Sequence, residues 1–262
     1  MRQVCLISFL ESVRSHIFHA ILVFSFIFMF LSMFFAYFFM QDVGKVVVDF
    51  NLSAIAMGGL LISFFVSVGL IGKDLDKRTI YFVLGRGISR EKYIYGKFAG
   101  LLLIVFTAYI LMFAVSFIPL LLMKELAPLH FKSFSGNAYF LGVLADLFKC
   151  ILLNAVIIFL SSFVTTSFTI LIFSIFIYVT GETLAEVIGY LSVAKSGVII
   201  ESVIGIAKYL VPNFAALDFK LLVANGIIPS LNIVIISIAY SIIYSIILIF
   251  FAGVIFKKRE FL

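Results

Sequence analysis

Residues 73–97 read KDLDKRTIYFVLGRGISREKYIYGK and lie between two long apolar runs. The segment holds seven of the chain's 19 Lys and Arg residues. Loops rich in Lys and Arg tend to stay on the cytoplasmic side of a membrane, which is the positive-inside tendency. We therefore expect residues 73–97 to form a cytoplasmic loop that a soluble partner can reach.

The remainder of the chain has the composition of an integral membrane protein. Hydrophobic residues make up 64% of its 262 residues and charged residues 12%, values far outside those of soluble domains. A transmembrane helix requires roughly 20 apolar residues. Six runs reach that length, and they predict an all-α membrane protein with a single transmembrane domain over residues 1–262. The predicted spans are residues 17–40, 52–71, 98–123, 140–164, 168–190 and 229–256.

Two further segments are apolar without forming predicted spans. In residues 1–15, Arg2, Glu11 and Arg14 alternate with apolar side chains, which favours an amphipathic interfacial helix. A cytoplasmic extension of the first span is the alternative. Residues 191–228 are apolar but broken by Lys, Glu, Gly and Pro, and we expect short re-entrant helices on the outer face there. A seventh span is the alternative, but it would place the basic C-terminal tail outside.

The distribution of charge predicts the orientation. Six spans place both termini on the same side as residues 73–97. That side carries twelve Lys and Arg residues and five acidic residues, a net charge of +7. The rest of the chain carries seven Lys and eight acidic residues, a net charge of −1. By the positive-inside tendency, both termini are expected in the cytoplasm. Because orientation explains the excess of basic residues, no nucleic-acid partner is expected.

Small and charged residues occur inside the predicted spans. Gly59, Ser63 and Ser67 repeat every four residues in the second span and form a small ridge that allows a neighbouring helix to approach closely. Asp146 and Lys149 are spaced i,i+3 at the start of the fourth span, where we expect an ion pair near the outer interface.

Two acidic residues, Glu182 and Glu186, stand one turn apart on the outer portion of the fifth span. They belong to an outer site or extend toward the lipid headgroups. Neither they nor Asp146 has a His or Cys at a spacing that would indicate a catalytic set.

The sequence predicts no metal site and no nucleotide site. Cys5 and Cys150 are expected at different depths, so neither a disulfide nor a Cys/His metal cluster is predicted. Gly96 and Lys97 are followed by Phe98 and lack the upstream Gly of a G-x-x-x-x-G-K-[ST] phosphate-binding loop. Energy for active transport would therefore have to come from another polypeptide.

The segment 73–97 has an internal pattern. Its apolar residues 79–84 are followed by Gly85 and Gly87, and Ser89 is a candidate N-cap for the helix that leads into the third span. The pattern predicts a short helix, a glycine bend and a second helix. The alternative is that the charges of the loop only anchor the topology.

With these features, the chain resembles the ABC type-2 permeases, the membrane subunits of ATP-binding-cassette exporters. The resemblance covers essentially the whole chain and is carried by the loop between the second and third spans, by a motif before the last span and by the basic tail. Gly87 is a departure, because a proline often precedes Ile-Ser-Arg in the family. The matching residues are Arg78-Thr79-Ile80, Leu84-Gly85, Ile88-Ser89-Arg90, Tyr93, Gly96-Lys97, Tyr209-Leu210-Val211-Pro212-Asn213-Phe214, Leu217-Asp218 and Phe256-Lys257-Lys258-Arg259-Glu260-Phe261.

The resemblance implies a non-catalytic exporter subunit in the inner membrane of a prokaryote, loosely like the permeases linked to multicopper-enzyme maturation. It implies a dimer with a second copy or a paralogue, contact with membrane lipid, and two cytoplasmic ATPase subunits that bind ATP and Mg²⁺. The implied residues for coupling to the ATPase are Asp74, Arg78, Thr79, Ile80, Ser89, Arg90 and Lys97. The implied outer-gate residues are Glu182, Glu186, Pro212, Asn213 and Asp218.

Other functions stay open at this point. A passive channel or a membrane assembly scaffold is the main alternative, although a channel usually has a polar stripe along its spans. An intramembrane enzyme is the weaker one. The sequence leaves the cargo open, since a Phe-rich cleft fits a lipid, a hydrophobic drug or a peptide, and also fits plain helix packing.

Overall fold

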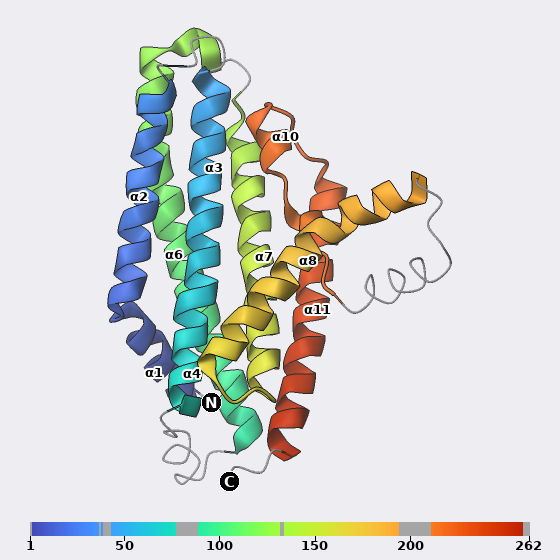
Figure 1. Cartoon of the computed structure of the whole chain (residues 1–262). Coiled ribbons are helices and arrows are strands. Elements are labelled where there is room, and N and C mark those ends of the chain that lie inside the picture. Colours follow the sequence, from blue (N-terminus) through green and yellow to red (C-terminus); the bar gives the residue numbers. More distant parts are fainter. Residues whose placement is uncertain are drawn as a thin grey trace.

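The computed structural model (Figure 1) describes residues 2–36, 38, 43–76, 89–131, 134–193 and 211–258. The predicted coupling residues Arg78, Thr79 and Ile80 lie outside the described residues. So do residues 194–210, which belong to the predicted re-entrant region.

All regular structure in the described ranges is helical. Six helical stretches are long and apolar enough to cross a membrane, so the chain is a multi-pass membrane protein and the predicted all-α fold with six spans is confirmed. The stretches are His16–Ala36 (α2), Val43–Asp74 (α3 Val43–Leu61, the π-helical η1 Ile62–Ser67, and the start of α4 Val68–Asp76), Arg90–Leu126 (α6), Gly136–Ser161 (α7), Ser167–Leu184 within α8 (Ser167–Val193), and Leu231–Lys258 (α11). The shorter elements are α1 (Arg2–Val13), η2 (Pro128–Phe131), η3 (Ala215–Leu217) and α10 (Lys220–Ala224).

The second span is longer than its apolar run, because it begins at Val43 and not at residue 52. Val43, Val47 and Asn51 repeat every four residues and are buried. The amide of Asn51 donates a hydrogen bond to Ser32 Oγ of α2 at 3.2 Å. Lys45 is exposed on the opposite face. Helical periodicity therefore extends through a stretch whose charges suggested a loop.

Helix α7 forms the centre of the bundle. In its apolar stretch 83% of the residues are buried, against 22% for α8, 28% for α11 and 33% for α2. Helix α11 packs along α7, α2 along α3, and α1 along α6. The outer helices α2, α8 and α11 expose Phe, Ile and Leu side chains, the surface that a helix presents to lipid. Helix α8 crosses the bundle obliquely (Figure 1).

One end of the bundle, here called the terminal end, carries α1, the last turn of α11 and the facing ends of α4 and α6 (Figure 1). The predicted helix at the N-terminus forms as α1 and ends at Val13. Its buried face is Val4, Ser8 and Ser12. A Cβ at Gly100 of α6 would lie 2.7 Å from Ser8 Cβ, so glycine lets α1 approach α6 closely.

Candidate functional site

A buried ionic cluster, here called the loop-base cluster, consists of Asp74, Tyr93 and Lys97. Lys97 Nζ lies 2.7 Å from Asp74 Oδ2, and the two side chains are only 5% and 17% exposed. The Tyr93 hydroxyl donates a hydrogen bond to the same carboxylate oxygen at 2.5 Å. Tyr93 and Lys97 lie one turn apart on α6 and so share a helix face. The cluster fastens α4 to α6 at the two points where residues 77–88 leave and rejoin the described chain.

More exposed contacts join this base to its neighbours. Lys73 of α4 pairs with Glu11 of α1 at 2.9 Å. Glu91 of α6 pairs with Lys257 of α11 at 3.0 Å, and Arg90 Nη1 donates to the Lys257 carbonyl at 3.3 Å. The terminal end therefore links α1, α4, α6 and α11 through polar contacts around one buried pair.

The structure thus places four of the seven predicted coupling residues near one another. Asp74 and Lys97 are paired, and Arg90 begins α6 beside the end of α11. Ser89 occupies the N-cap position of α6, with φ −65° and ψ 145°, although its side chain makes no capping hydrogen bond. Tyr93 was not among the predicted coupling residues, but its i−4 spacing from Lys97 would have indicated it.

The ridge of the second span faces α6 and α7. Asn154 of α7 donates to Ser63 Oγ at 3.2 Å and accepts from Ser67 Oγ at 2.5 Å. A Cβ at Gly59 would lie 2.2 Å from the Tyr109 hydroxyl. The three small residues therefore allow Tyr109 and Asn154 to contact the backbone-rich face of the second span.

A second cluster, here called the mid-span cluster, contains Lys149, Glu182 and Asp218 with Asp146 and Lys220 beside them. Lys149 Nζ lies 2.8 Å from Glu182 Oε1 and 3.3 Å from Asp218 Oδ2, and its side chain is 4% exposed. Lys149 is the fourteenth of the 26 residues of α7, about 20 Å along a helix of about 39 Å. Ionisable residues at that depth are costly and mark functional sites more often than surface charges do.

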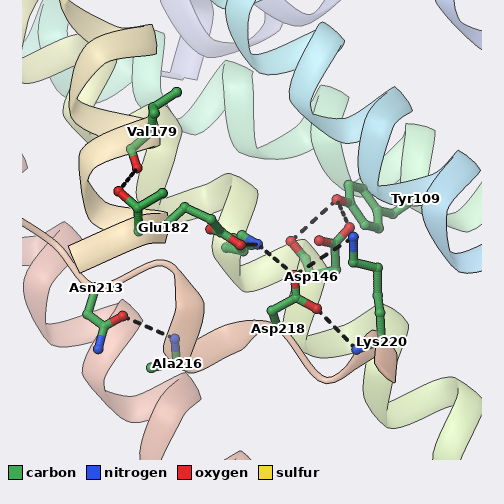
Figure 2. A network of polar contacts seen from close by, with 10 residues as sticks. Tyr109, Asp146, Val179, Glu182, Asn213, Ala216, Asp218 and Lys220 are labelled. Carbon is green, nitrogen blue, oxygen red and sulfur yellow. Dashed lines mark hydrogen bonds and ion pairs between the residues drawn. The ribbon is translucent and has the colours of Figure 1, made fainter. Parts of the chain in front are cut away.

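The predicted ion pair between Asp146 and Lys149 is wrong. Both residues are described, and the ion pairs of Lys149 are with Glu182 and Asp218. Asp146 instead accepts a hydrogen bond from the Tyr109 hydroxyl at 2.7 Å. Figure 2 shows Asp146 next to Tyr109, with Glu182 on the opposite side of the cluster and Asp218 between Asp146 and Lys220. Because Tyr109 of α6 satisfies Asp146, the ammonium group of Lys149 can reach α8 and the loop after η3.

The two residues also lie farther from the start of the helix than the sequence predicts. Helix α7 begins at Gly136, four residues before the predicted start of the span at residue 140, and Ser135 caps it by accepting from the Ala138 amide at 3.4 Å. The earlier start moves Asp146 and Lys149 about 6 Å deeper along the helix.

Asp218 reaches the cluster from outside the six spans. Burial alone would raise its pKa, but Lys149 and Lys220 together with the Lys220 backbone amide outweigh burial and lower the pKa below its usual value. Lys220 Nζ lies 3.7 Å from Asp218 Oδ2. The carboxylate is therefore held in its charged form by two cations from different elements.

The segment before Asp218 is fixed to α8 and α11. The backbone N–H of Asn213 donates a hydrogen bond to the Tyr240 hydroxyl at 2.9 Å. Tyr240 is nine residues into α11, about 14 Å along its axis. The Phe214 amide donates to the Gly181 carbonyl at 3.2 Å. A Cβ at Gly181 would lie 2.2 Å from the Pro212 carbonyl oxygen. This close approach places Pro212 and Asn213 next to the turn of α8 that carries Glu182.

Four of the five predicted outer-gate residues therefore gather around α8: Glu182, Pro212, Asn213 and Asp218. Glu186 lies one turn farther along α8 with an exposed side chain. Sequence reasoning missed two tyrosines of this cluster. Tyr109 donates to Asp146, and the ring of Tyr178 has its centroid 5.8 Å from Lys149 Nζ. Nothing in their local sequence indicates these contacts, because each partner comes from another helix.

Within the described residues, no group of three or more His, Cys, Asp or Glu side chains could hold a metal ion. Scanned against models of known protein families, the sequence matches none. A search of curated proteins likewise gives no significant match.

Proposed function

We propose that the chain is the membrane subunit of an ABC exporter. In this proposal it is a non-catalytic permease in the inner membrane of a prokaryote, with both termini cytoplasmic. It pairs with a second permease and uses ATP hydrolysed by separate subunits docked on residues 73–97. The observation that carries the proposal is the buried pair of Asp74 and Lys97. Because that pair joins the last turn of α4 to the second turn of α6, on either side of the loop, a force on the loop acts on the second and third spans together.

The surrounding contacts support the same mechanism. The Glu11–Lys73 and Glu91–Lys257 pairs are exposed, and exposed pairs contribute only about 0–1 kcal/mol. They can break and re-form as the helices move. The Asp74–Lys97 pair is largely buried, and leaving one charge of a buried pair without its partner costs about 3–5 kcal/mol. The base of the loop would therefore move as one body against α1 and α11.

In the same proposal, residues 211–224 act as the re-entrant outer gate. Asn213 and Phe214 are held to α11 and α8, and Asp218 is held to α7 through Lys149. A rearrangement of α7 relative to α8 would change the distance between Lys149 and its two acidic partners. The ion pairs of Lys149 would then hold the closed state of the gate.

Affinity purification of the tagged chain from its native membranes, after amine-reactive crosslinking, tests the proposal. We expect a soluble ATPase with a Walker A loop to be recovered, crosslinked to lysines of residues 73–97. Combined charge reversal at Arg78 and Arg90 should lower its recovery about tenfold, since like charges placed across an interface cost more than 1 kcal/mol.

Lys124→Glu is the matched control, because Lys124 lies at the far end of α6 from Arg90 and is exposed. It should leave the recovery unchanged. If no ATPase is recovered with the purified chain, or if the Arg78/Arg90 reversals and Lys124→Glu lower its recovery equally, the loop charges only set the topology.

A further inference from the structure

A groove of about 460 Å³ lies at the terminal end, between the α1–α2 junction and the second span. It adjoins the loop-base cluster, because Lys73 directly precedes Asp74 and Lys97 Nζ lies 3.5 Å from the Leu70 carbonyl oxygen. Its rim is polar and includes Arg14, His16 and Lys73, and its floor is apolar and includes Ile17, Phe65 and Leu70. Its volume lies within the range of small-molecule sites, about 300–1,000 Å³.

The rim carries an excess of positive charge. Lys73 is shared with Glu11, and both side chains of that pair are more than a third exposed. Arg14 is exposed and forms no ion pair with any other described residue. The guanidinium group of Arg matches phosphate oxygens in geometry and charge. An anion at this rim would contact Arg14 directly and would compete with Glu11 for Lys73.

Ser12 belongs to the inner wall of the groove. Its side chain lines the groove and is only 2% exposed. The residue lies on the buried face of α1, so the polar groups that a ligand in the groove can reach are those of the exposed rim.

The floor of the groove is shaped by the π-helical segment Ile62–Ser67. A π-helical turn is rare and occurs often at functional sites. On its inner side Ser63 and Ser67 are held by Asn154, while Phe65 on the outer side is 47% exposed and lines the groove. The apolar lining comes from the first turn of the first span and from residues 65–70 of the second.

We propose that this groove binds one anionic phospholipid of the leaflet at the terminal end, which the charge distribution predicts to be the cytoplasmic leaflet. The phosphate lies against Arg14 and Lys73. An acyl chain follows Ile17 and Phe65 into the bilayer. A soluble phosphate would satisfy the rim but would leave the apolar floor empty, which is why a lipid is favoured. The lipid proposal does not rest on the transport function proposed above, although Lys73 belongs to both.

Gly69 offers a clean way to fill the groove. It lines the floor, and a Cβ added there would meet no atom within 4 Å. Leu is a better helix former than Gly, so Gly69→Leu should fold at least as well as the wild type while occupying the position of the acyl chain. Gly136→Leu is the matched control, since Gly136 also has open space around its Cβ and lies at the opposite end of the bundle.

Native mass spectrometry of the purified full-length protein, titrated with phosphatidylglycerol or phosphatidylcholine in detergent, measures the binding. We expect one phosphatidylglycerol to bind at least tenfold more tightly than phosphatidylcholine. Gly69→Leu and Arg14→Gln should each weaken phosphatidylglycerol binding about tenfold or more, and Gly136→Leu should not. Glu11→Gln should strengthen it severalfold, because Lys73 loses its competing carboxylate.

Three results would overturn the proposal. Equal affinity for the two lipids would remove the role of the rim charges. Equal effects of Gly69→Leu and Gly136→Leu would place any bound lipid elsewhere. Displacement of phosphatidylglycerol by millimolar inorganic phosphate would assign the rim to a soluble anion in place of a lipid.

Discussion

Lys149→Met is the substitution that tests the mid-span cluster most directly. Met matches the Lys side chain as far as Cε and lacks the charged Nζ, so Glu182 and Asp218 lose the cation 2.8 Å and 3.3 Å away. Asp218 retains Lys220 at 3.7 Å. Glu182 retains no cation among the described residues. Its second carboxylate oxygen, Oε2, is buried and has no hydrogen-bond partner among them either.

Removing one member of a buried pair costs about 3–5 kcal/mol, because the partner charge stays behind. The lower end of that range applies here, since Lys220 and protonation of the acids compensate in part. For a chain of this size, each kcal/mol lowers the unfolding midpoint by about 2–4 °C, so we expect a loss of about 6–12 °C.

Thermal unfolding in detergent, followed by a thiol-reactive dye, provides the measurement. Cys150 is a free cysteine with 0% exposure, and in a Cys5→Ser background it becomes the single reporter thiol. Because Cys150 is adjacent to the substituted residue, helix loss by circular dichroism at the same scan rate provides a second readout. A fixed rate matters, since membrane proteins often unfold irreversibly.

Two controls make the outcome decisive. Lys220→Met removes a cation that is 31% exposed and 3.7 Å from its partner, so we expect a loss of no more than about 3 °C. Combining Lys149→Met with Glu182→Gln and Asp218→Asn should recover at least half of the lost midpoint, because no buried charge is left unpaired. A Lys149→Met midpoint within about 2 °C of the wild type, or a larger loss for Lys220→Met, would refute the reasoning.

Three further predictions use the same unfolding assay. Gly181→Ala should lower the midpoint by several degrees, since its Cβ would lie 2.2 Å from a backbone oxygen and overpacking costs about 1–3 kcal/mol; Gly136→Ala, with open space at its Cβ, should not. Lys97→Met should destabilise the terminal end by about 3 kcal/mol, and adding Asp74→Asn should restore most of it, as expected for a buried pair; an equally unstable double variant would contradict the pairing. The pKa of Asp218 is lowered in the folded state. Its contribution to the free energy of unfolding is therefore complete above its unfolded pKa of about 3.9 and is lost as the pH falls through the folded pKa. Between about pH 5 and pH 3 the midpoint of Asp218→Asn should therefore fall less steeply than that of the wild type, and parallel curves would exclude the linkage.

The number of spans could be predicted from the sequence because the bilayer sets the length of each apolar run. Their ends could not. Lys45 and Asp49 made residues 43–51 resemble a loop, yet Val47 and Asn51 are buried against neighbouring helices. A single charged face does not end a helix whose opposite face is packed. The start of α6 was the exception, because Ser89 was predicted as the N-cap of the helix leading into the third span, and α6 does begin at Arg90.

The pairing inside the bundle was beyond sequence reasoning for a different physical reason. The i,i+3 rule predicted Asp146 as the partner of Lys149 because it considers one helix alone. Glu182 and Asp218 are 33 and 69 residues away along the chain, and the competing hydroxyl of Tyr109 comes from α6. Asp74 and Lys97 were both predicted as coupling residues, but their contact requires two antiparallel spans to lie side by side. The sequence thus identified the charged residues of both clusters. It could not identify their partners, because those come from other helices.

A series of polar contacts along the central helix lies between the two clusters. Ser63 and Ser67 of the second span bond to Asn154 of α7, and Asn154 donates to the Cys150 carbonyl one turn earlier. Cys150 Sγ lies 3.1 Å from the Tyr109 hydroxyl, which donates to Asp146. The second, third and fourth spans therefore meet at one buried polar seam between the loop base and the acids around Lys149.

This seam limits the motions that could connect the two clusters. Spatial continuity alone does not establish energetic coupling, but the second span cannot slide along α7 without breaking the hydrogen bonds of Asn154. Helix α8 is mostly exposed, so it can shift against the bundle while breaking fewer interactions. A movement that begins at residues 73–97 would therefore carry the second, third and fourth spans together. The distances that change would be those from Lys149 to Glu182 and Asp218.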